Sequence, residues 1–245
     1  MYRFFEQENA LKSDSLYLNS ENTHHILNVL RMREDELFEV VIDKKVYLGN
    51  FTKKEGESLV VNVKDIYEDT NESKIKIHLY QGLPKSDKLE LIIQKCIELG
   101  VSEITPFTSS RTIVKWDVKK ESKKLKRYED IAEAAAKQSK RGYIPKINGV
   151  IDFGMLIEQI KDNVSILAYE NRGNSLRNVL RDEASKNINI IIGPEGGFSE
   201  QEVESLAENG AKVVHLGNRI LRTETAAIAL VAMIQYEIGD VNEEI

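Results

Sequence analysis

An apolar stretch that runs straight into a glycine-rich turn constrains this chain more than any other feature. Residues 188–192 (INIII) are typical of a buried strand, and residues 193–198 (GPEGGF) follow at once, ahead of a helix start at Ser199. Glu202, three residues on, completes a capping box with Ser199. Glycines at the carboxyl end of a buried strand let a ligand approach the backbone, and ligands of α/β sheets bind at that end. The turn lacks GxGxxG spacing, so it does not indicate a dinucleotide-binding fold.

Strands and helices alternate around this turn. Apolar or alternating runs predict strands at residues 75–79, 103–107, 164–168, 188–192 and 213–216. Helices are expected between residues 87 and 100, at 122–139, at 199–209 and at 224–238, with Ser86 or Asp87 capping the first and Gly100 ending it. This order is typical of an α/β fold with a parallel sheet.

The first 70 residues have a different pattern. Short β-branched runs predict strands at residues 37–42, 46–51 and 59–63, with one helix at residues 20–32. A wholly polar stretch at residues 68–73 is typical of a linker. We therefore expect a small β-barrel over residues 1–70 and an α/β domain over residues 74–245.

Two further loops are expected beside the glycine-rich turn. Residues 168–173 (AYENRG) and 216–227 (LGNRILRTETAA) also follow predicted strands, so the three loops could converge on one pocket. Arg222 precedes a helix that is apolar almost all round, where the helix dipole disfavours a cation. Either Arg222 has a function of its own, or it pairs with Glu224 or Glu195.

Composition narrows the class of protein. Hydrophobic residues make up 41% and charged residues 30% of the chain, which is close to a globular average. Cys96 is the only cysteine, no apolar run reaches the ~18 residues of a membrane span, and the N-terminus lacks the pattern of a signal peptide. We therefore expect a cytoplasmic protein without a metal centre.

The net charge of −6 argues mildly against a nucleic-acid partner, but it is unevenly distributed. Residues 111–146 hold twelve Lys or Arg and five Asp or Glu, a local balance of +7, so the rest of the chain carries −13. RNA responds to the local face rather than to the total. A solvated helix face is the other interpretation of this segment, and composition alone favours it.

Residues 192–199 (IGPEGGFS) and 216–226 (LGNRILRTETA) together resemble motifs of the 16S rRNA (uracil-N3)-methyltransferase family of the SPOUT superfamily. Residues 24–31 (HHILNVLR), 81–85 (QGLPK) and 133–141 (EAAAKQSKR) are similar to further stretches of that family, in the same order. The resemblance therefore covers nearly the whole chain. Residues 32–36 (MREDE) depart from it, because the family usually has a glycine near this turn.

The resemblance implies an N-terminal PUA-like β-barrel, a parallel-sheet α/β domain with a deep trefoil knot, and a homodimer. The knot loops of the family bind S-adenosylmethionine. Carried onto this sequence, those loops supply the cofactor-binding candidates Tyr169, Glu170, Ile192, Gly193, Pro194, Gly196, Gly197, Leu216, Gly217, Ile220, Leu221, Thr223 and Ala226. Burial of the apolar last helix against a second subunit would agree with the implied dimer.

The implied reaction methylates N3 of one uridine in small-subunit rRNA. N3 must lose or share its proton at attack, and the flanking carbonyl oxygens gain negative charge, which a cation can stabilise. Arg222 is the expected catalytic cation, and Glu195 is a candidate proton acceptor. The candidate RNA-binding residues are Arg3, Arg31, Lys85, Arg111, Lys137, Gln138, Lys140, Arg141 and Arg172. His24 and His25 are expected to serve the structure of the barrel.

Other functions stay open at this point. A methyltransferase of the same superfamily that acts on tRNA or 23S rRNA would have a similar pocket. An RNA-binding or ribosome-assembly protein with a vestigial pocket would bind no cofactor. A dinucleotide-dependent oxidoreductase is disfavoured, because no phosphate fingerprint or acidic ribose partner is present.

Overall fold

The computed structural model describes residues 1–12, 15–114, 116, 121–161, 163–181 and 186–241. The chain packs as two compact units, an N-terminal unit of Met1–Glu72 with Ala136–Ile144 and a C-terminal unit of Ser73–Ala135 with Pro145–Ile245. The boundary falls within the polar stretch at residues 68–73. Ala136–Ile144, however, packs with the N-terminal unit, although the sequence placed it in the second domain.

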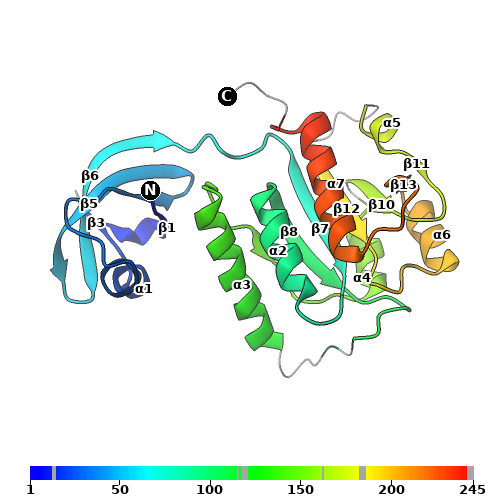
Figure 1. The fold of residues 1–245 in the computed structure, drawn as a ribbon, viewed down its shortest axis with the longest axis horizontal. Coiled ribbons are helices and arrows are strands. Elements are labelled where there is room, and N and C mark those ends of the chain that lie inside the picture. Colours follow the sequence, from blue (N-terminus) through cyan, green and yellow to red (C-terminus); the bar gives the residue numbers. More distant parts are fainter. Residues whose placement is uncertain (13–14, 115, 117–120, 162, 182–185, 242–245) are drawn as a thin grey trace. The chain divides into compact units, whose positions relative to one another are not determined.

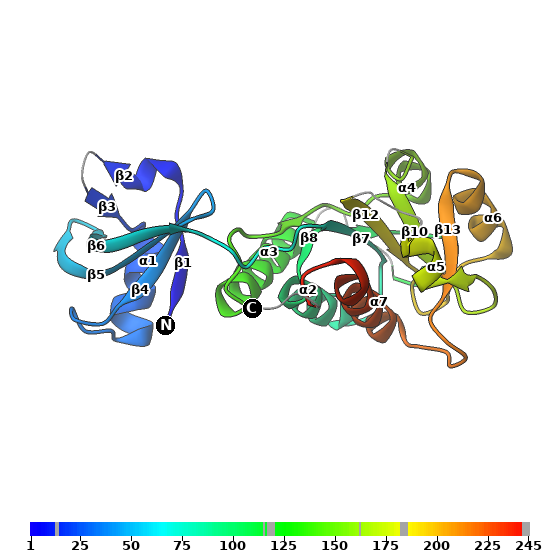
Figure 2. The ribbon, with the colours of Figure 1, turned by 90° about the horizontal axis from the view of Figure 1, so that it is seen from above.

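The N-terminal unit is built on a strongly curved six-stranded sheet in the order β1-β4-β5-β6-β3-β2 (Figure 2). Its strands are β1 (Arg3–Phe5), β2 (Leu11–Lys12), β3 (Ser15–Tyr17), β4 (Phe38–Ile42), β5 (Lys45–Glu55) and β6 (Ser58–Glu68). β1 pairs with β4 in parallel, and the other neighbours are antiparallel. Phe4, Leu16 and Phe38 belong to the apolar core of this unit. The three strands predicted here are confirmed as β4, β5 and β6.

The helix expected at residues 20–32 is regular only in its first half. Asn19 caps α1 (Ser20–His24) by accepting a hydrogen bond from Asn22 N at 2.8 Å. His25–Leu30 then forms a π-helical turn that ends at Arg31, whose φ is 52°. A π turn takes in one extra residue, and the left-handed end lets Met32 N donate to Ile26 O at 3.1 Å. The side chains of Ile26 and Met32 are both buried in the core of this unit.

The polar stretch predicted as a linker is held in place by ion pairs. β6 extends through Glu68, and the side chain of Asp69 is only 1% exposed beside Arg3. Glu72 Oε2 lies 2.8 Å from Arg141 Nη2. The boundary between the two units falls in this stretch, as expected of a linker, but the carboxylates of Asp69 and Glu72 have buried cationic partners.

The C-terminal unit contains a seven-stranded sheet in the order β11-β13-β10-β12-β7-β8-β9 (Figure 1). Its strands are β7 (Lys76–Gly82), β8 (Val101–Phe107), β9 (Lys146–Ile147), β10 (Val164–Ala168), β11 (Asn174–Ser175), β12 (Asn187–Ile192) and β13 (Ala211–His215). Every neighbouring pair is parallel, which confirms the predicted parallel α/β sheet. β12, the strand before the glycine-rich turn, lies between β10 and β7 and is buried from Ile188 to Ile192.

Helices cover both faces of this sheet (Figures 1 and 2). They are α2 (Lys88–Glu98), α3 (Glu121–Gln138), α4 (Phe153–Gln159), α5 (Leu176–Arg181), α6 (Glu200–Glu208) and α7 (Thr223–Ile238). α2 and α7 pack side by side, and α5 contacts α7. α4 and α6 contribute to a core on the other face with Tyr80, Phe107 and Leu167. α4 and α5 are short helices that the sequence did not predict.

Two of the predicted helix caps have different outcomes. Ser199 and Glu202 form the expected capping box at the start of α6. Asp87 occupies the capping position of α2 but makes no side-chain cap; its carbonyl accepts from Glu90 N and Leu91 N instead. No helix of the described residues is long and apolar enough to cross a membrane. The trefoil knot implied by the resemblance stays a prediction.

Candidate functional site

The carboxyl ends of three neighbouring strands surround one cavity. β13, β10 and β12 are adjacent and parallel, so the segments that follow them meet at one edge of the sheet. The cavity has a volume of about 400 Å³, within the range of ligand sites. A smaller pocket of about 60 Å³ shares Ala168, Glu170, Leu221 and Ala226 with it. The three loops that were expected to converge therefore line adjoining spaces at one edge of the sheet.

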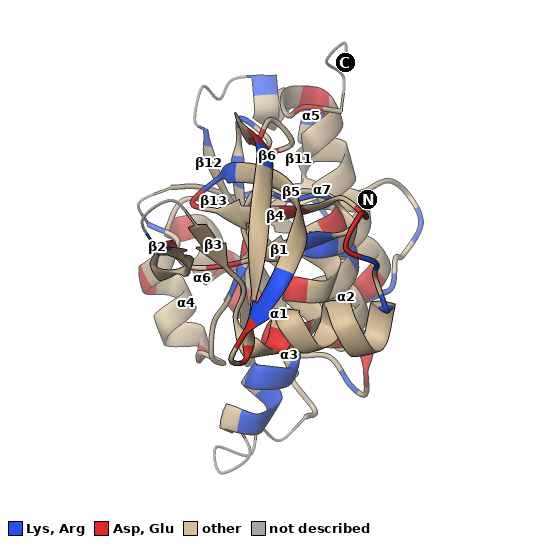
Figure 3. Ribbon diagram, turned by 90° about the vertical axis from the view of Figure 1, so that its left-hand side faces the viewer, with Lys and Arg blue, Asp and Glu red and all other residues tan. Residues whose placement is uncertain are grey.

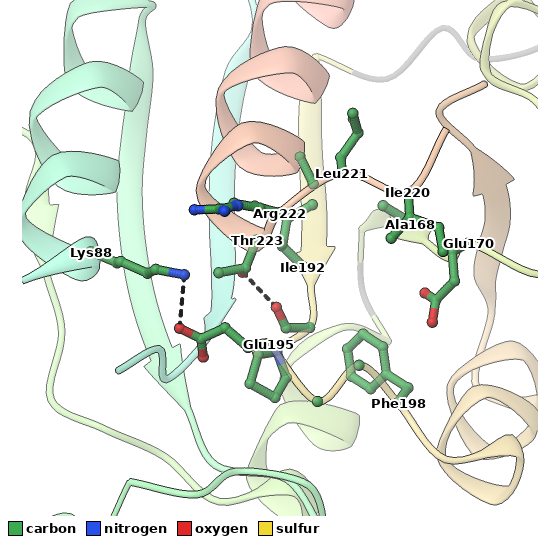
Figure 4. Close-up of a pocket in the computed structure, with 15 residues that line it drawn as sticks. Lys88, Ala168, Glu170, Ile192, Glu195, Phe198, Ile220, Leu221, Arg222 and Thr223 are labelled. Atoms are coloured by element: carbon green, nitrogen blue, oxygen red, sulfur yellow. Dashed lines mark hydrogen bonds and ion pairs between the residues drawn. The ribbon is translucent and has the colours of Figure 1, made fainter. Parts of the chain in front are cut away.

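Every residue predicted to hold a cofactor lines one of these two spaces. The larger one is lined by Glu170, Ile192, Gly193, Pro194, Gly196, Gly197, Ile220, Leu221, Thr223 and Ala226, among others. Tyr169, Leu216 and Gly217 line the smaller one. Figure 4 shows Glu170 and Phe198 on one side of the larger cavity, with Lys88, Glu195 and Arg222 on the other. The cavity thus has two chemically different ends, one with a single carboxylate and one with several charges.

The glycine-rich turn leaves no room for side chains. Gly197 has φ 66°, a conformation that L side chains rarely adopt. A Cβ at Gly196 would lie 2.8 Å from the carbonyl oxygen of Arg111, closer than real Cβ atoms come. The turn is anchored at its far end, where Phe198 is 2% exposed and lies nearly parallel to Phe107. These constraints present the backbone of the turn to the cavity.

A buried hydrogen-bond chain joins this turn to the start of α7. Thr223 Oγ1 donates to Gly193 O at 2.6 Å, and Gln81 Nε2 donates to Thr223 Oγ1 at 2.9 Å. Gln81 is fully buried at the end of β7. The next residue, Gly82, packs so closely on the turn that an added Cβ would lie 2.4 Å from Pro194 N. Gln81 and Gly82 of the QGLPK stretch therefore support the glycine-rich turn that lines the cavity. The sequence did not reveal this role.

Arg222 directly precedes α7 and is exposed. Its backbone carbonyl accepts a hydrogen bond from Ala226 N at 2.8 Å. Its guanidinium has no hydrogen bond or ion pair with the described part of the chain, so the second option from the sequence, pairing with Glu224 or Glu195, is not what the structure shows. Both carboxylates instead meet Lys88, whose Nζ lies 3.1 Å from Glu195 Oε1 and 3.2 Å from Glu224 Oε2 (Figure 4 draws the first of these contacts).

Sequence reasoning missed Lys88. It is the first residue of α2, where the helix dipole disfavours a cation, and it lines the cavity. The same reasoning that singled out Arg222 could have found it. Hydrogen bonds to Glu195 and to Glu224 raise the pKa of Lys88, so its ammonium stays charged at neutral pH.

The carboxylate of Glu195 is held by several donors. Burial on its own would raise the pKa of Glu195, but hydrogen bonds from the backbone N–H groups of Glu195 and Lys85 and from Lys88 outweigh it, and the pKa is lowered. Lys85 N lies 3.1 Å from Oε1. A carboxylate with a lowered pKa binds a proton weakly, so this geometry suits an anchor of the loop better than a strong base.

Three of the predicted RNA-binding residues belong to the C-terminal unit and lie close to the cavity walls. Lys85 contacts Glu195 through its backbone, and Arg111 Nη1 donates to Gly196 O at 3.3 Å. Arg172 Nη2 lies 3.7 Å from Glu200 Oε2 and is more than half exposed. The contact with RNA expected of these three residues stays a prediction.

The other six candidates belong to the N-terminal unit, where two of them are buried. Arg3 Nε lies 2.8 Å from Glu39 Oε2, and Arg141 is 3% exposed beside Glu72. Lys140 Nζ contacts the same Glu39 oxygen at 2.7 Å. Arg3 and Arg141 thus have partners within the protein, and their expected contact with RNA stays a prediction.

The remaining candidates of this unit are Arg31 and Gln138, which are exposed, and Lys137, which is half-buried. Lys and Arg residues also lie on the first turns of α3 (Figure 3). One of them, Arg127, pairs with Glu90. Lys115, Lys119 and Lys120, which contribute to the basic balance of residues 111–146, lie outside the described residues. Among the described residues no group of three or more His, Cys, Asp or Glu is placed to hold a metal ion.

Comparison with known proteins identifies relatives along the whole chain. A family model described as an RNA methyltransferase domain matches residues 71–235, and one described as an RNA methyltransferase PUA domain matches residues 18–64. The chain is 36% identical to ribosomal RNA small subunit methyltransferase E of Bacillus subtilis, with 97% of each chain covered. It is also 36% identical to the protein of the same name from Mesomycoplasma hyopneumoniae, with 94% of this chain and 97% of the relative covered.

A solved structure agrees with these relatives. Ribosomal RNA small subunit methyltransferase E from Neisseria gonorrhoeae, bound to S-adenosyl methionine, is 33% identical to the chain and superposes with a TM-score of 0.87. The superposition covers 98% of this chain and 99% of that one. Fold and sequence therefore point to the same relatives.

Proposed function

The chain belongs to the family of ribosomal RNA small subunit methyltransferase E, and on that premise we propose that it methylates N3 of a uridine in 16S rRNA with S-adenosylmethionine as the donor. One observation carries the proposal. The three loops that the resemblance assigned to the cofactor line a single edge of the sheet, and Arg222 reaches the same cavity without a partner among the described residues.

The cavity fits a ligand that carries an apolar ring, hydroxyl groups and charge. Ile192, Leu221 and Ala226 supply apolar wall, and the glycine-rich turn supplies backbone donors and acceptors. Glu170 supplies a carboxylate that can accept from hydroxyl or ammonium groups. The bound cofactor supplies the methyl group from its sulfonium. The protein's part is to align that group with the acceptor nitrogen, which positioning achieves without a metal.

The acceptor uridine would enter at the end of the cavity that holds the cations. Its N3 would accept the methyl group from the sulfur of the bound donor, and the N3 proton would leave to solvent or to a protein acceptor. Negative charge then develops on the carbonyl oxygens beside N3. Arg222 lines the same cavity, and its guanidinium would stabilise that charge, as a preorganised group of this kind contributes several kcal/mol.

Glu195 serves this reaction best as a fixed anchor. Its carboxylate receives Lys85 N and Lys88 Nζ, and its lowered pKa weakens it as a proton acceptor. N3 is normally buried in a base pair, so the target uridine must be unpaired or flipped. The cations Lys85, Arg111 and Arg172 near the cavity, with Arg31, Lys137 and Lys140 on the N-terminal unit, would contact phosphates, and such binding weakens steeply with salt.

A homodimer is part of the proposal. Met233 and Tyr236 of α7 are 37% and 56% exposed, and they line an apolar hollow of about 440 Å³ with Leu176, Leu180 and Ala232. An exposed apolar face of this kind on the last helix fits a second copy of the chain. Since the proposed substrate is ribosomal RNA, the site of action would be the cytoplasm.

The test is transfer of labelled methyl from S-adenosylmethionine to small ribosomal subunits that lack the modification, followed by identification of the labelled nucleoside. Label in N3-methyluridine supports donor, reaction and substrate together. Label in another nucleoside, or in tRNA or 23S rRNA alone, reassigns the substrate while keeping the donor. Absence of label together with absence of donor binding overturns the proposal and favours an assembly protein.

A further inference from the structure

Lys88 lies between the carboxylates of Glu195 and Glu224. Glu195 comes from the turn after β12, Glu224 is the second residue of α7, and Lys88 is the first residue of α2. The side-by-side packing of α2 and α7 brings Lys88 to Glu224, and the turn after β12 brings Glu195 to the same ammonium. Lys88 Nζ meets both carboxylates at 3.1 and 3.2 Å, and its side chain is 29% exposed.

Loss of Lys88 would leave the carboxylates of Glu195 and Glu224 without this ammonium and open to another cation, such as Arg222. Glu224 is two residues away from it in the chain, and Glu195 lines the same cavity. In Figure 4 the side chains of Arg222 and Lys88 extend from opposite directions, and their cationic ends lie on the same side of the cavity as Glu195. Guanidinium groups frequently pair with carboxylates through two parallel hydrogen bonds. No such pair forms at the side chain of Arg222 among the residues described, where Lys88 already contacts both carboxylates.

We propose that Lys88 is a positioning residue, which occupies the carboxylates of Glu195 and Glu224 and so keeps the guanidinium of Arg222 available to the acceptor base. The inference rests on the role proposed above for Arg222. Lys88 also balances negative charge near the acceptor. Two uncompensated carboxylates there would oppose the charge that develops on the base during methyl transfer.

The contacts predict what the loss of Lys88 would do. In Lys88→Met the two carboxylates have no ammonium between them, and one of them is expected to pair with Arg222. We expect kcat on small ribosomal subunits to fall about tenfold or more, because a lost preorganised donor costs about 10²–10³-fold and the loss here is partial. The KM for S-adenosylmethionine should change much less. Lys88→Arg, which keeps a cation, should retain most of the activity.

A second substitution separates sequestration from direct contact with the substrate. If Lys88 acts by holding carboxylates, then Lys88→Met combined with Glu224→Gln should recover a large part of kcat, because the competing charge is removed. A Lys88 that touches the base directly would not be replaced by this change. Lys95→Met is the matched control, since Lys95 lies on the same helix and pairs with Glu98 instead.

A measurement on the free protein tests the same inference without activity. The side-chain N–H signal of Arg222 in nitrogen-15 NMR, assigned with Arg222→Lys, should shift toward a carboxylate-paired state in Lys88→Met and return in the double variant. An unchanged Arg222 signal in Lys88→Met, or a double variant no more active than Lys88→Met, overturns the inference. The wild-type protein in the same transfer assay reports on the proposed function separately, because its failure there leaves the NMR comparison intact.

Discussion

Two clusters of charge in this molecule use the same residue types in opposite ways. In the N-terminal unit, Arg3, Lys140 and Arg141 meet Glu39, Asp69 and Glu72, and the two arginines are almost fully buried. In the C-terminal unit, Lys88 meets Glu195 and Glu224, and Arg222 beside them is exposed and has no partner among the described residues. The buried arginines, Arg3 and Arg141, stabilise the fold through their ion pairs. Arg222 is exposed and its guanidinium is unpaired among the described residues, so it is available to a ligand.

The difference follows from the cost of burying charge. Removing a guanidinium from water is costly unless each of its donors finds an acceptor. Arg3 Nε donates to Glu39, and Nη1 donates to Asp69 and to the carbonyl oxygens of Lys140 and Arg141, which offsets much of this cost. These contacts join β1, the end of β6 and the segment after α3, which explains why Ala136–Ile144 belongs to the N-terminal unit.

The largest expected effect tests the buried cluster of the N-terminal unit, in which Arg3, Lys140 and Arg141 meet Glu39, Asp69 and Glu72; we call it the closed cluster. Arg3→Met removes one partner of buried carboxylates, and breaking a buried pair in this way costs about 3–5 kcal/mol. Urea unfolding of the N-terminal unit should show the loss. Arg33→Met is the matched control, because Arg33 pairs with Asp35 and Glu36 while 73% exposed, and exposed pairs contribute about 0–1 kcal/mol. Equal losses in both variants would contradict the comparison.

The open cluster, which consists of Lys88, Glu195 and Glu224 with the exposed Arg222, is tested by Arg222→Ala. Turnover should fall about 10²–10³-fold, as for the loss of a preorganised donor to developing charge, while the Kd for S-adenosylmethionine changes little. Methyl transfer and calorimetric titration of the cofactor measure the two quantities. The free energy of unfolding should be nearly unchanged, unlike that of Arg3→Met. Turnover equal to wild type would remove Arg222 from the mechanism.

The hydrogen-bond chain behind the cavity gives a smaller effect. Thr223→Val leaves Gln81 Nε2 without its hydroxyl acceptor and Gly193 O without its donor, and an unsatisfied buried polar group costs about 1–3 kcal/mol. The Kd for S-adenosylmethionine should rise about tenfold, since about 1.4 kcal/mol corresponds to one decade. Thr223→Ser keeps the hydroxyl and should bind nearly as well as wild type. A normal Kd in Thr223→Val would show that this chain does not order the turn.

Acid should act on the two units in different pH ranges. Burial lowers the pKa of His78 to about 4, and His78 Nε2 lies 2.7 Å from Thr105 Oγ1 in the C-terminal unit. The unfolded state binds the proton from about pH 6.5 downward and the folded state only near pH 4, so stability falls between these values as pH falls. The slope is at most about 1.4 kcal/mol per pH unit.

The closed cluster should respond only at lower pH. Burial would raise the pKa of Glu39, but Lys140 and Arg3 outweigh it and lower the pKa. A carboxyl with a lowered folded pKa contributes stability above its unfolded pKa of about 4.3 and loses it as pH falls through the folded value. Thermal unfolding from pH 7 to 3 should show a loss from pH 6.5 downward that His78→Gln diminishes. If Glu39→Gln diminished it instead, the assignment would be reversed.

Local sequence was sufficient for the elements around the cavity. β12, its glycine-rich turn and α6 were predicted because an apolar strand, small residues and a capping box follow one another within about twenty residues. The parallel sheet followed from the alternation of strands and helices. The cofactor loops were predicted from the resemblance, and the structure lines them around one space.

The decisive pairings could not be read from local sequence, because they join residues far apart in the chain. Gln81 and Thr223 are separated by 142 positions, and Arg3 and Asp69 by 66. Sequence patterns indicated that Arg3, Arg141 and Arg222 were cations worth notice. Only tertiary packing decides which of them is enclosed by carboxylates and which is not, since that depends on which backbone segments approach one another. Lys88, placed by the contact of α2 with α7, is the clearest case.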